Sequence, residues 1–330
     1  MKEVLQLLLH LKYDILCRVT GKTIPHVNGE VSGRDFKYYI FDWDDNILHM
    51  PTKIRMEHLE ADGKWKPVEI STSTFALIRA DTAHYRPPRD GGWDAAFRNF
   101  ADEPDRNRFL EDTIKALERV AHGEKPGPSY NALKKTLREG RLFAIVTARG
   151  HSPETIEQAV RVFIRYALSE AEREEMMSNL RGYRQWIDGV GDGEFGTDAE
   201  ELDYYLGMCR YSAVTYDGFK ERMEADPIYR EKIALSPNAS RPELAKEFAI
   251  RDFVEHVFHM LRRSGNLNRP VSIGFSDDDL GNVKTVSDYI RAELSKRFEG
   301  IKFVVYDTSD RALSKGRKVC VAGQLNLPGF

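Results

Sequence analysis

The chain has little cysteine, no long hydrophobic run and no excess of charge of one sign. Only three cysteines occur among its 330 residues, and they lie too far apart to form a metal-binding motif. Scattered free thiols are typical of a reducing compartment, so we expect a cytoplasmic protein. The formal net charge of −3 provides no global basic field for binding nucleic acid.

The leucine-rich stretch near the N-terminus is too short and too polar to span a membrane or to act as a signal peptide. Residues 5–11 are interrupted by Gln6 and His10, and charged residues follow at once. We expect residues 2–19 to form an amphipathic helix that packs on the core. With 41% apolar and 31% charged residues, the chain has the composition of a soluble globular protein without a membrane partner.

A cluster of carboxylates follows a short apolar run at residues 38–46, Tyr-Tyr-Ile-Phe-Asp-Trp-Asp-Asp-Asn. The run has the length and the aromatic, β-branched content of a buried strand. Asp42, Asp44 and Asp45 come directly after it, where open α/β sheets bind their ligands. Because three close carboxylates repel one another and resist burial, we expect a hard cation, Mg²⁺ above all, as their partner.

Two other interpretations compete for this cluster. Asp42, Asp44 and Asn46 match the first three ligand positions of a calcium-binding helix-loop-helix loop. However, Ile47 replaces the glycine that such a loop requires, and Lys53 replaces its glutamate. The second alternative, a solvated acidic turn after a strand, stays open when this stretch is taken alone.

Alternating strand and helix patterns along the chain predict the fold class. Further strands are expected at 141–147, 270–276 and 301–306, with another within 202–216. Such alternation predicts an α/β protein with a doubly wound, mainly parallel, Rossmann-like sheet. Right-handed crossovers would bring the strand ends at Phe41, Thr147 and Ser276 to one edge of that sheet.

Two segments are expected to lie outside this core. Asp62-Gly63 between two strand-like arms predicts a β-hairpin over residues 52–70. The interval 169–240 is longer than a bare crossover needs, which predicts a mostly helical insertion. The α/β core would then comprise residues 1–51, 71–168 and 241–330. The loop 84–93 carries Arg86 and Arg89, which either contact an anionic substrate or belong to a solvated surface.

Four motifs in order resemble those of the haloacid-dehalogenase-like (HAD) hydrolases. Residues 42–46 resemble the first motif, and the strand ending in Thr147 resembles the second. Lys246, near the start of a predicted helix, resembles the third, and residues 272–279 resemble the fourth. Asn46 departs from the family pattern, which has Thr or Val there. The hairpin resembles the family's flap, and the interval 169–240 lies where one class of substrate cap is inserted.

The resemblance implies a phosphatase-type enzyme that hydrolyses phosphomonoesters through an aspartyl-phosphate intermediate. Asp42 would be the nucleophile, and Asp44 would protonate the leaving oxygen and later activate water. Thr147 would hydrogen-bond a phosphoryl oxygen. Lys246 would offset the negative charge of Asp42 and of the phosphoryl group.

The resemblance also implies a Mg²⁺ cofactor. Its ligands would be Asp42, the backbone carbonyl of Asp44, and Asp277, with Asp278 as a further ligand or a partner of one. Which of Asp277, Asp278 and Asp279 touches the metal stays open. The hairpin and the loop 84–93 would shape the near side of the substrate pocket, and the interval 169–240 would form an outer lid.

Several alternative functions share parts of this pattern. A phosphomutase has the same motif set, whereas a dehalogenase lacks an aspartate at the position of Asp44 and needs no metal. A nucleic-acid end-processing phosphatase is supported only by the loop with Arg86, Arg89 and Trp93, without a basic stripe. A catalytically silent HAD-like binding protein is the alternative outside the enzymes. A phosphorylated small molecule is the expected partner.

Overall fold

The computed structural model describes residues 27–191, 193–235, 241–310, 312–313 and 315–323. The helix predicted for residues 2–19 lies outside these ranges. Within them, every helix is too short or too polar to cross a membrane.

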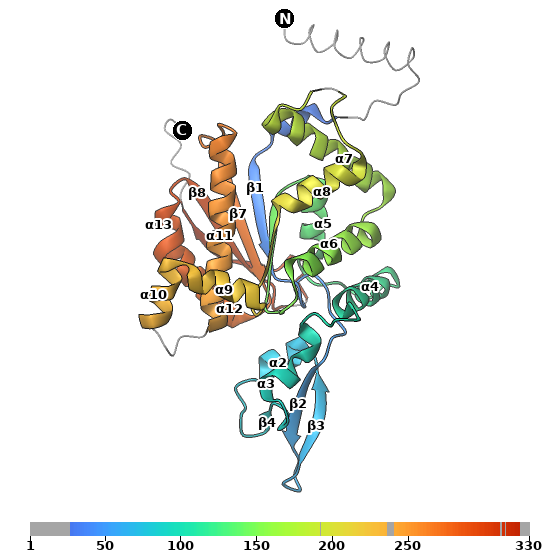
Figure 1. Ribbon diagram of the computed structural model, residues 1–330, viewed down its shortest axis with the longest axis vertical. Coiled ribbons are helices and arrows are strands. Elements are labelled where there is room, and N and C mark those ends of the chain that lie inside the picture. The colour runs from blue at the N-terminus through green and yellow to red at the C-terminus, as the bar shows by residue number, and fades with distance from the viewer. Residues whose placement is uncertain (1–26, 192, 236–240, 311, 314, 324–330) are drawn as a thin grey trace, which may run out of the picture.

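A six-stranded sheet forms the centre of the molecule (Figure 1). Its strand order is β6-β5-β1-β7-β8-β9, and every neighbouring pair is parallel except β8 with β9. The strands are β1 (Phe36–Phe41), β5 (Phe143–Thr147), β6 (Arg210–Ala213), β7 (Val271–Asp277), β8 (Ile301–Asp307) and β9 (Arg317–Ala322). The predicted α/β class with a mainly parallel sheet is therefore confirmed, and antiparallel β9 is an addition that the sequence analysis did not predict.

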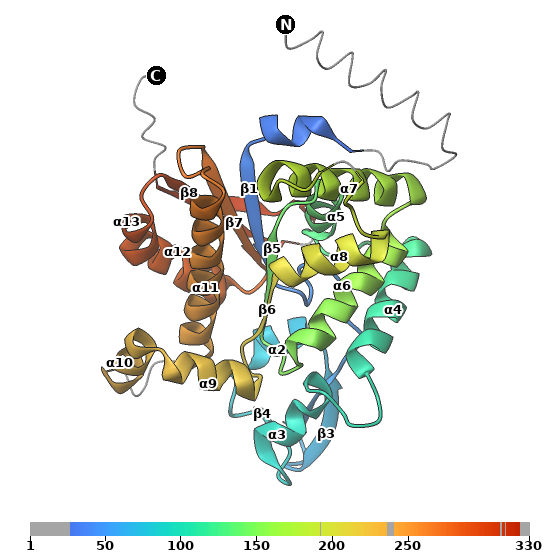
Figure 2. The same cartoon turned by 45° about the horizontal axis from the view of Figure 1, so that its top comes forward.

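Helices cover this sheet, and the burial of its central strands explains why their sequences are apolar. The helices of the main body are α4 (Arg108–Ala121), α5 (Tyr130–Arg138), α6 (Pro153–Ala167), α7 (Glu170–Tyr183), α8 (Asp198–Met208), α9 (Asp217–Ala225), α10 (Pro227–Leu235), α11 (Arg241–Arg263), α12 (Leu280–Tyr289) and α13 (Ser295–Arg297). Helix α5 contacts β1, α6 contacts β6, and α4 packs against α6 (Figure 2). Helix α11 contacts β5 and α12, and α12 contacts β7 and β8. All five residues of β5 are buried, as expected for a central parallel strand covered on both faces.

Short helical segments complete the main body. Two are the 3₁₀ turns η1 (Gly29–Gly33) and η2 (Arg98–Phe100). Two are π-helical extensions, η3 (Arg184–Asp188) after α7 and η4 (Ile290–Leu294) after α12.

A small module projects from the carboxyl edge of the main sheet (Figure 1). Strands β2 (Ile54–Leu59) and β3 (Trp65–Ile70) pair as the antiparallel hairpin that Asp62-Gly63 predicts. Strand β4 (Tyr85–Arg86) adds a third strand, and α2 (Thr72–Ile78) and α3 (Gly92–Ala96) complete the unit. It has its own hydrophobic cluster, which includes Ile54, Ile70 and Phe100. Residues 71–100, which the sequence analysis assigned to the main core, therefore lie with the hairpin, and residues 54–100 are called the module below.

Part of the interval predicted to form a lid, residues 169–213, lies elsewhere in the structure. Strand β6 is within it and pairs with β5, so this interval completes one edge of the main sheet. Helix α7 receives a hydrogen bond at Ser178 from Asn28, just before β1, and Tyr205 of α8 donates to the carbonyl of Arg141, just before β5. Helices α7 and α8 are thus attached at the amino end of the strands, whereas a lid for the predicted site must cover the carboxyl end. The expected outer lid is therefore wrong for α7 and α8, whereas for α9 and α10, which follow the carboxyl end of β6, it stays a prediction.

Candidate active site

Three neighbouring strands end together on the carboxyl edge of the main sheet. Strand β1 lies between β5 and β7, and Phe41 is in register with the ends of both. Asp42 follows β1, Thr147 ends β5 and Asp277 ends β7. The backbone amide of Asp42 also donates to the carbonyl of Ser276, at 3.0 Å, which holds the first motif against the fourth. Asp42 and Asp277 are therefore brought to the same edge, although more than two hundred positions separate them in the sequence.

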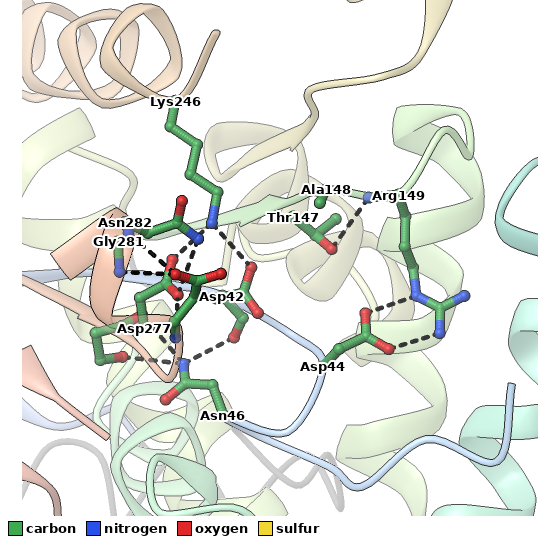
Figure 3. Close-up of polar contacts among 12 residues, drawn as sticks. Asp42, Asp44, Asn46, Thr147, Ala148, Arg149, Lys246, Asp277, Gly281 and Asn282 are labelled. Carbon is green, nitrogen blue, oxygen red and sulfur yellow. Dashed lines mark hydrogen bonds and ion pairs between the residues drawn. The ribbon is translucent and has the colours of Figure 1, made fainter. Parts of the chain in front are cut away.

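Lys246 reaches this edge from α11 and pairs with two of these carboxylates (Figure 3). Its ammonium nitrogen lies 2.6 Å from an oxygen of Asp277 and 3.5 Å from an oxygen of Asp42. All three side chains are buried. Burial alone would lower the pKa of Lys246, but the charges of Asp277 and Asp42 raise it above its ordinary value. Lys246 is therefore a fixed positive charge at the end of β1.

The carboxylates at this edge outnumber the ammonium that faces them. Burial raises the pKa of Asp42 well above its usual range, Lys246 partly opposes this, and Asp277 adds to it. Burial likewise raises the pKa of Asp278, with Asp277 and Asp45 contributing. The site therefore has an affinity for additional positive charge, either a proton or a cation.

The available ligand atoms fit a hard cation such as Mg²⁺. Among the described residues, no three His, Cys, Asp or Glu side chains surround one point as a metal-binding group. The predicted ligand set needs only two such side chains, Asp42 and Asp277, because the backbone carbonyl of Asp44 supplies the third oxygen. That carbonyl already accepts the amide of Asn46, at 2.6 Å, and a carbonyl oxygen has a second lone pair. Oxygen donors with an excess of negative charge are the kind of site that Mg²⁺ prefers.

Asp44 points away from this group and binds Arg149 (Figure 3). The Nε and Nη2 atoms of Arg149 each donate to one carboxylate oxygen of Asp44 at 2.7 Å. Both side chains are buried, and such a two-pronged pair is among the strong charge-assisted interactions. The sequence analysis did not identify Arg149. Its only sequence signal is its place two residues after Thr147, where a strand ends.

Asn46, the departure from the family pattern, has a structural task. It is fully buried, and its amide nitrogen donates to the carbonyl of Asp42 at 2.9 Å and to both oxygens of Ser276. Its amide oxygen accepts the hydroxyl hydrogen of Thr308 at 2.8 Å. A side chain with both donors and an acceptor is needed for this set of bonds, and neither Thr nor Val provides it. Asn46 therefore ties the end of β1 to the ends of β7 and β8.

Thr147 lies at the predicted position, at the buried end of β5. Its hydroxyl oxygen accepts the amide of Arg149 at 3.4 Å, a long contact that leaves the hydroxyl hydrogen available to another acceptor. Helix α6 begins shortly after it, with Ser152 capping the amide of Thr155. The hydroxyl of Thr147 can therefore donate to an anion at this edge.

No family model, curated protein or solved structure matches this chain. The resemblance to the HAD hydrolases consequently stays a prediction, and it rests on the four motifs and on the geometry described above.

The loop 84–93, predicted to contact substrate, lies within the module. One of its two arginines already binds other residues of the module. Arg86 donates from Nε to Glu57 at 2.7 Å, and its guanidinium lies 4.0 Å from the centre of the Trp65 ring. Arg89 is exposed, and the pKa of Glu57 is lowered mainly by the hydrogen bond from Arg86, with a smaller contribution from the backbone of Arg89. The side chain of Arg86 is thus committed to the module's own sheet, and the structure does not bring it to Asp42.

A cavity of about 460 Å³ lies at the opposite edge of the main sheet. It is lined by side chains from the start of β1, from α7 and α8 and from the end of α11, among them Phe36, Tyr205 and Met260. None of the predicted site residues lines it. The candidate active site is instead at the carboxyl edge, on the side of the sheet from which the module projects.

Proposed function

We propose that this protein is a Mg²⁺-dependent phosphohydrolase of the HAD type that cleaves phosphomonoesters. The buried group of Asp42, Asp277 and Lys246 at the end of β1 carries this proposal. A carboxylate held beside a fixed ammonium, with a surplus of negative charge around it, suits a nucleophile that works together with a cation.

The first step forms an aspartyl-phosphate. A carboxylate oxygen of Asp42 attacks phosphorus, and the bond between phosphorus and the ester oxygen breaks. Asp44 gives its proton to that oxygen, which leaves as an alcohol. Lys246 and the hydroxyl of Thr147 stabilise the negative charge on the phosphoryl oxygens.

The second step releases phosphate. A water molecule gives a proton to Asp44 and attacks phosphorus, and the bond from phosphorus to Asp42 breaks. Because Asp44 is bound to Arg149 at both oxygens, proton transfer requires that this pair opens or shifts.

A metal ion has a defined place in this proposal. Asp42, Asp277 and the backbone carbonyl of Asp44 would hold Mg²⁺, with Asp278 as a further ligand or a partner of one. When bound, Mg²⁺ neutralises the charge of the phosphoryl group and orients it for attack.

An assay with a small aryl phosphate tests the function directly. The purified protein should release the phenol and phosphate in the presence of Mg²⁺, and an excess of chelator should stop the release. Equal turnover with and without the chelator would contradict the metal-dependent mechanism. A screen of phosphorylated metabolites and nucleic-acid ends would then identify the substrate, for which a phosphorylated small molecule is the first candidate.

One observation favours a second function, that of a catalytically silent binding protein. The buried ion pair with Arg149 holds the only carboxylate proposed for proton transfer. If this pair never opens, the site binds a phosphoryl group without cleaving it. Binding of inorganic phosphate with Mg²⁺, measured by calorimetry, together with no turnover of any ester in the screen, would support this alternative.

A further inference from the structure

Arg149 lies between the two chain segments that connect the module to the core. On the incoming side, its Nη2 atom donates to the hydroxyl of Thr52 at 3.0 Å, two residues before β2 begins. On the outgoing side, its guanidinium lies 4.6 Å from the centre of the Phe100 ring. The amide of Gly150 also donates to the carbonyl of Phe100 at 2.8 Å. Both connections of the module therefore contact residues 149–150.

The same guanidinium holds Asp44. Nη2 is shared between Asp44, at 2.7 Å, and Thr52. Thr52 in turn donates its hydroxyl hydrogen to Asp112 of α4 at 2.7 Å. All four side chains are buried, so each bond is made where water cannot replace a lost partner. The guanidinium is planar and its donors have fixed directions, so a shift of Thr52 tilts the donors that hold Asp44.

We propose that Arg149 is a positioning residue that couples the orientation of the Asp44 carboxylate to the position of the module. The catalytic consequence rests on the proposed function, because it assumes that Asp44 transfers the proton. The coupling itself does not depend on catalysis. The Nη1 atom of Arg149 is buried and makes no hydrogen bond, so the guanidinium retains a donor for a second arrangement in which it releases Asp44.

Helix α2 and the residue that ends it contact the core through one exposed ion pair and one part-buried hydrogen bond. Arg79, the C-cap residue of α2, pairs with Asp279 at 2.9 Å, but its side chain is 49% exposed, and such surface pairs contribute little to stability. Thr72 donates to Asp45 at 2.6 Å, a single hydrogen bond. Of these contacts between described residues, the one through Arg149 joins side chains that are all buried.

A kinetic experiment separates positioning from a merely structural role. Thr52→Val removes the hydroxyl bonded to Arg149 and leaves both bonds between Arg149 and Asp44. We expect kcat for an alkyl phosphate to fall by about tenfold and at most roughly 10²-fold, the effect of a small misplacement of a reacting group. KM and the turnover of an aryl phosphate, whose leaving group needs no proton, should change by less than about threefold.

Two further variants complete the kinetic set. Thr113→Val is the matched control, because Thr113 is fully buried on α4 and its hydroxyl makes no hydrogen bond; its kinetics should equal those of the parent. Arg149→Lys keeps the charge but loses the two-pronged geometry. It should show the same preference for the aryl ester, with a larger loss on the alkyl ester than Thr52→Val.

A distance measurement tests the coupling without any turnover. Spin labels are attached at Lys64→Cys in the hairpin turn and Lys284→Cys on α12, whose native side chains are 78% and 82% exposed. Cys17 is replaced by serine, and Cys209 and Cys320 are buried. Asp44→Asn and Thr52→Val should each broaden or shift the distance distribution between the labels, and Thr113→Val should not.

The outcomes distinguish this inference from the proposed function. Unchanged distances in both Asp44→Asn and Thr52→Val would overturn the coupling, whether or not the protein hydrolyses an ester. Changed distances with no turnover by the parent would support the coupling and contradict the phosphohydrolase. Turnover by the parent, with equal losses on alkyl and aryl esters in Thr52→Val, would overturn the positioning role of Arg149. If Arg149→Lys does not fold, the kinetics of Thr52→Val still test the positioning role of Arg149.

Discussion

Replacing Asp42 with asparagine should abolish turnover and at the same time stabilise the fold. The substitution keeps the volume of the side chain and removes one buried negative charge. Asp42 is 6% exposed, and burial is the main cause of its raised pKa. Its attraction to Lys246 opposes this, and its repulsion from Asp277 adds to it.

The two effects on stability can be compared from the geometry. At 3.5 Å from the ammonium of Lys246, the attraction is about 5 kcal/mol at an effective dielectric constant of about 20. Removing a carboxylate from water costs several kcal/mol, and the repulsion from Asp277 and Asp278 is added to that cost. Because the pKa of Asp42 is raised, the unfavourable contributions exceed the attraction. Asp42→Asn should therefore raise the free energy of unfolding by about 1–3 kcal/mol at neutral pH.

The stability difference should depend on pH. The pKa of this carboxyl group is higher in the folded state than in the unfolded chain. Between the two pKa values, the folded state therefore holds a proton that the unfolded chain has released. Above the ordinary value of 3.8 for Asp42, the folded state of the parent therefore loses stability as the pH rises towards the raised pKa. The advantage of Asp42→Asn should be absent at lower pH and should grow across this window.

Two measurements on the metal-free and Mg²⁺-loaded protein check these expectations. Urea unfolding at several pH values in the presence of a chelator gives the stability difference. Turnover of an aryl phosphate with Mg²⁺ should fall by roughly 10⁴–10⁶-fold, as when a catalytic nucleophile is removed. Normal turnover in Asp42→Asn would refute the aspartyl-phosphate mechanism. A variant less stable than the parent at neutral pH would refute the account of the buried charge.

Three further outcomes are expected. Asp44→Asn should retain binding of phosphate and Mg²⁺ but lose turnover of alkyl esters by roughly 10²–10⁴-fold, and an equal loss on aryl esters would rule out proton donation. His151 is buried and its pKa is lowered to about 3 by burial and by the charge of Arg149; stability should thus fall by about 1.4 kcal/mol per pH unit as the pH drops below 6.5, and acid titration of His151→Leu should show a shallower fall. Arg86→Ala should destabilise the module slightly through the lost bond to Glu57, with equal kinetics on small and multiply charged esters. Selective loss on the charged ester would support the predicted substrate role.

Local patterns in the sequence were sufficient for the parallel strands of the main sheet and for the residues at their ends, but not for β9. The run before Asp42 and the runs ending at Thr147 and Asp277 are apolar because each strand is covered by helices on both faces. Polar residues begin where that cover ends, so the strand ends can be located in a single sequence. Lys246 could be selected because a positive charge near the start of a helix is locally unfavourable.

Pairings between distant polar residues could not be obtained in this way. Arg149 and Asp44 are 105 positions apart, and nothing in either local pattern indicates the other. The same holds for Asn46, which contacts Ser276 and Thr308 only because three strand ends converge. Such contacts depend on strand order and register, which local hydrophobicity does not determine.

The sequence by itself determined the alternation of strands and helices, the parallel sheet and the acidic strand ends, because burial and backbone geometry impose local patterns. Only the tertiary structure shows that residues 71–100 join the hairpin in the module, and that α7 and α8 lie at the amino end of the strands. The pairing of Asp44 with Arg149 is likewise visible only in the tertiary structure. These features follow from which surfaces meet when the chain is packed, and the free energy of packing depends on partners that are distant in the sequence.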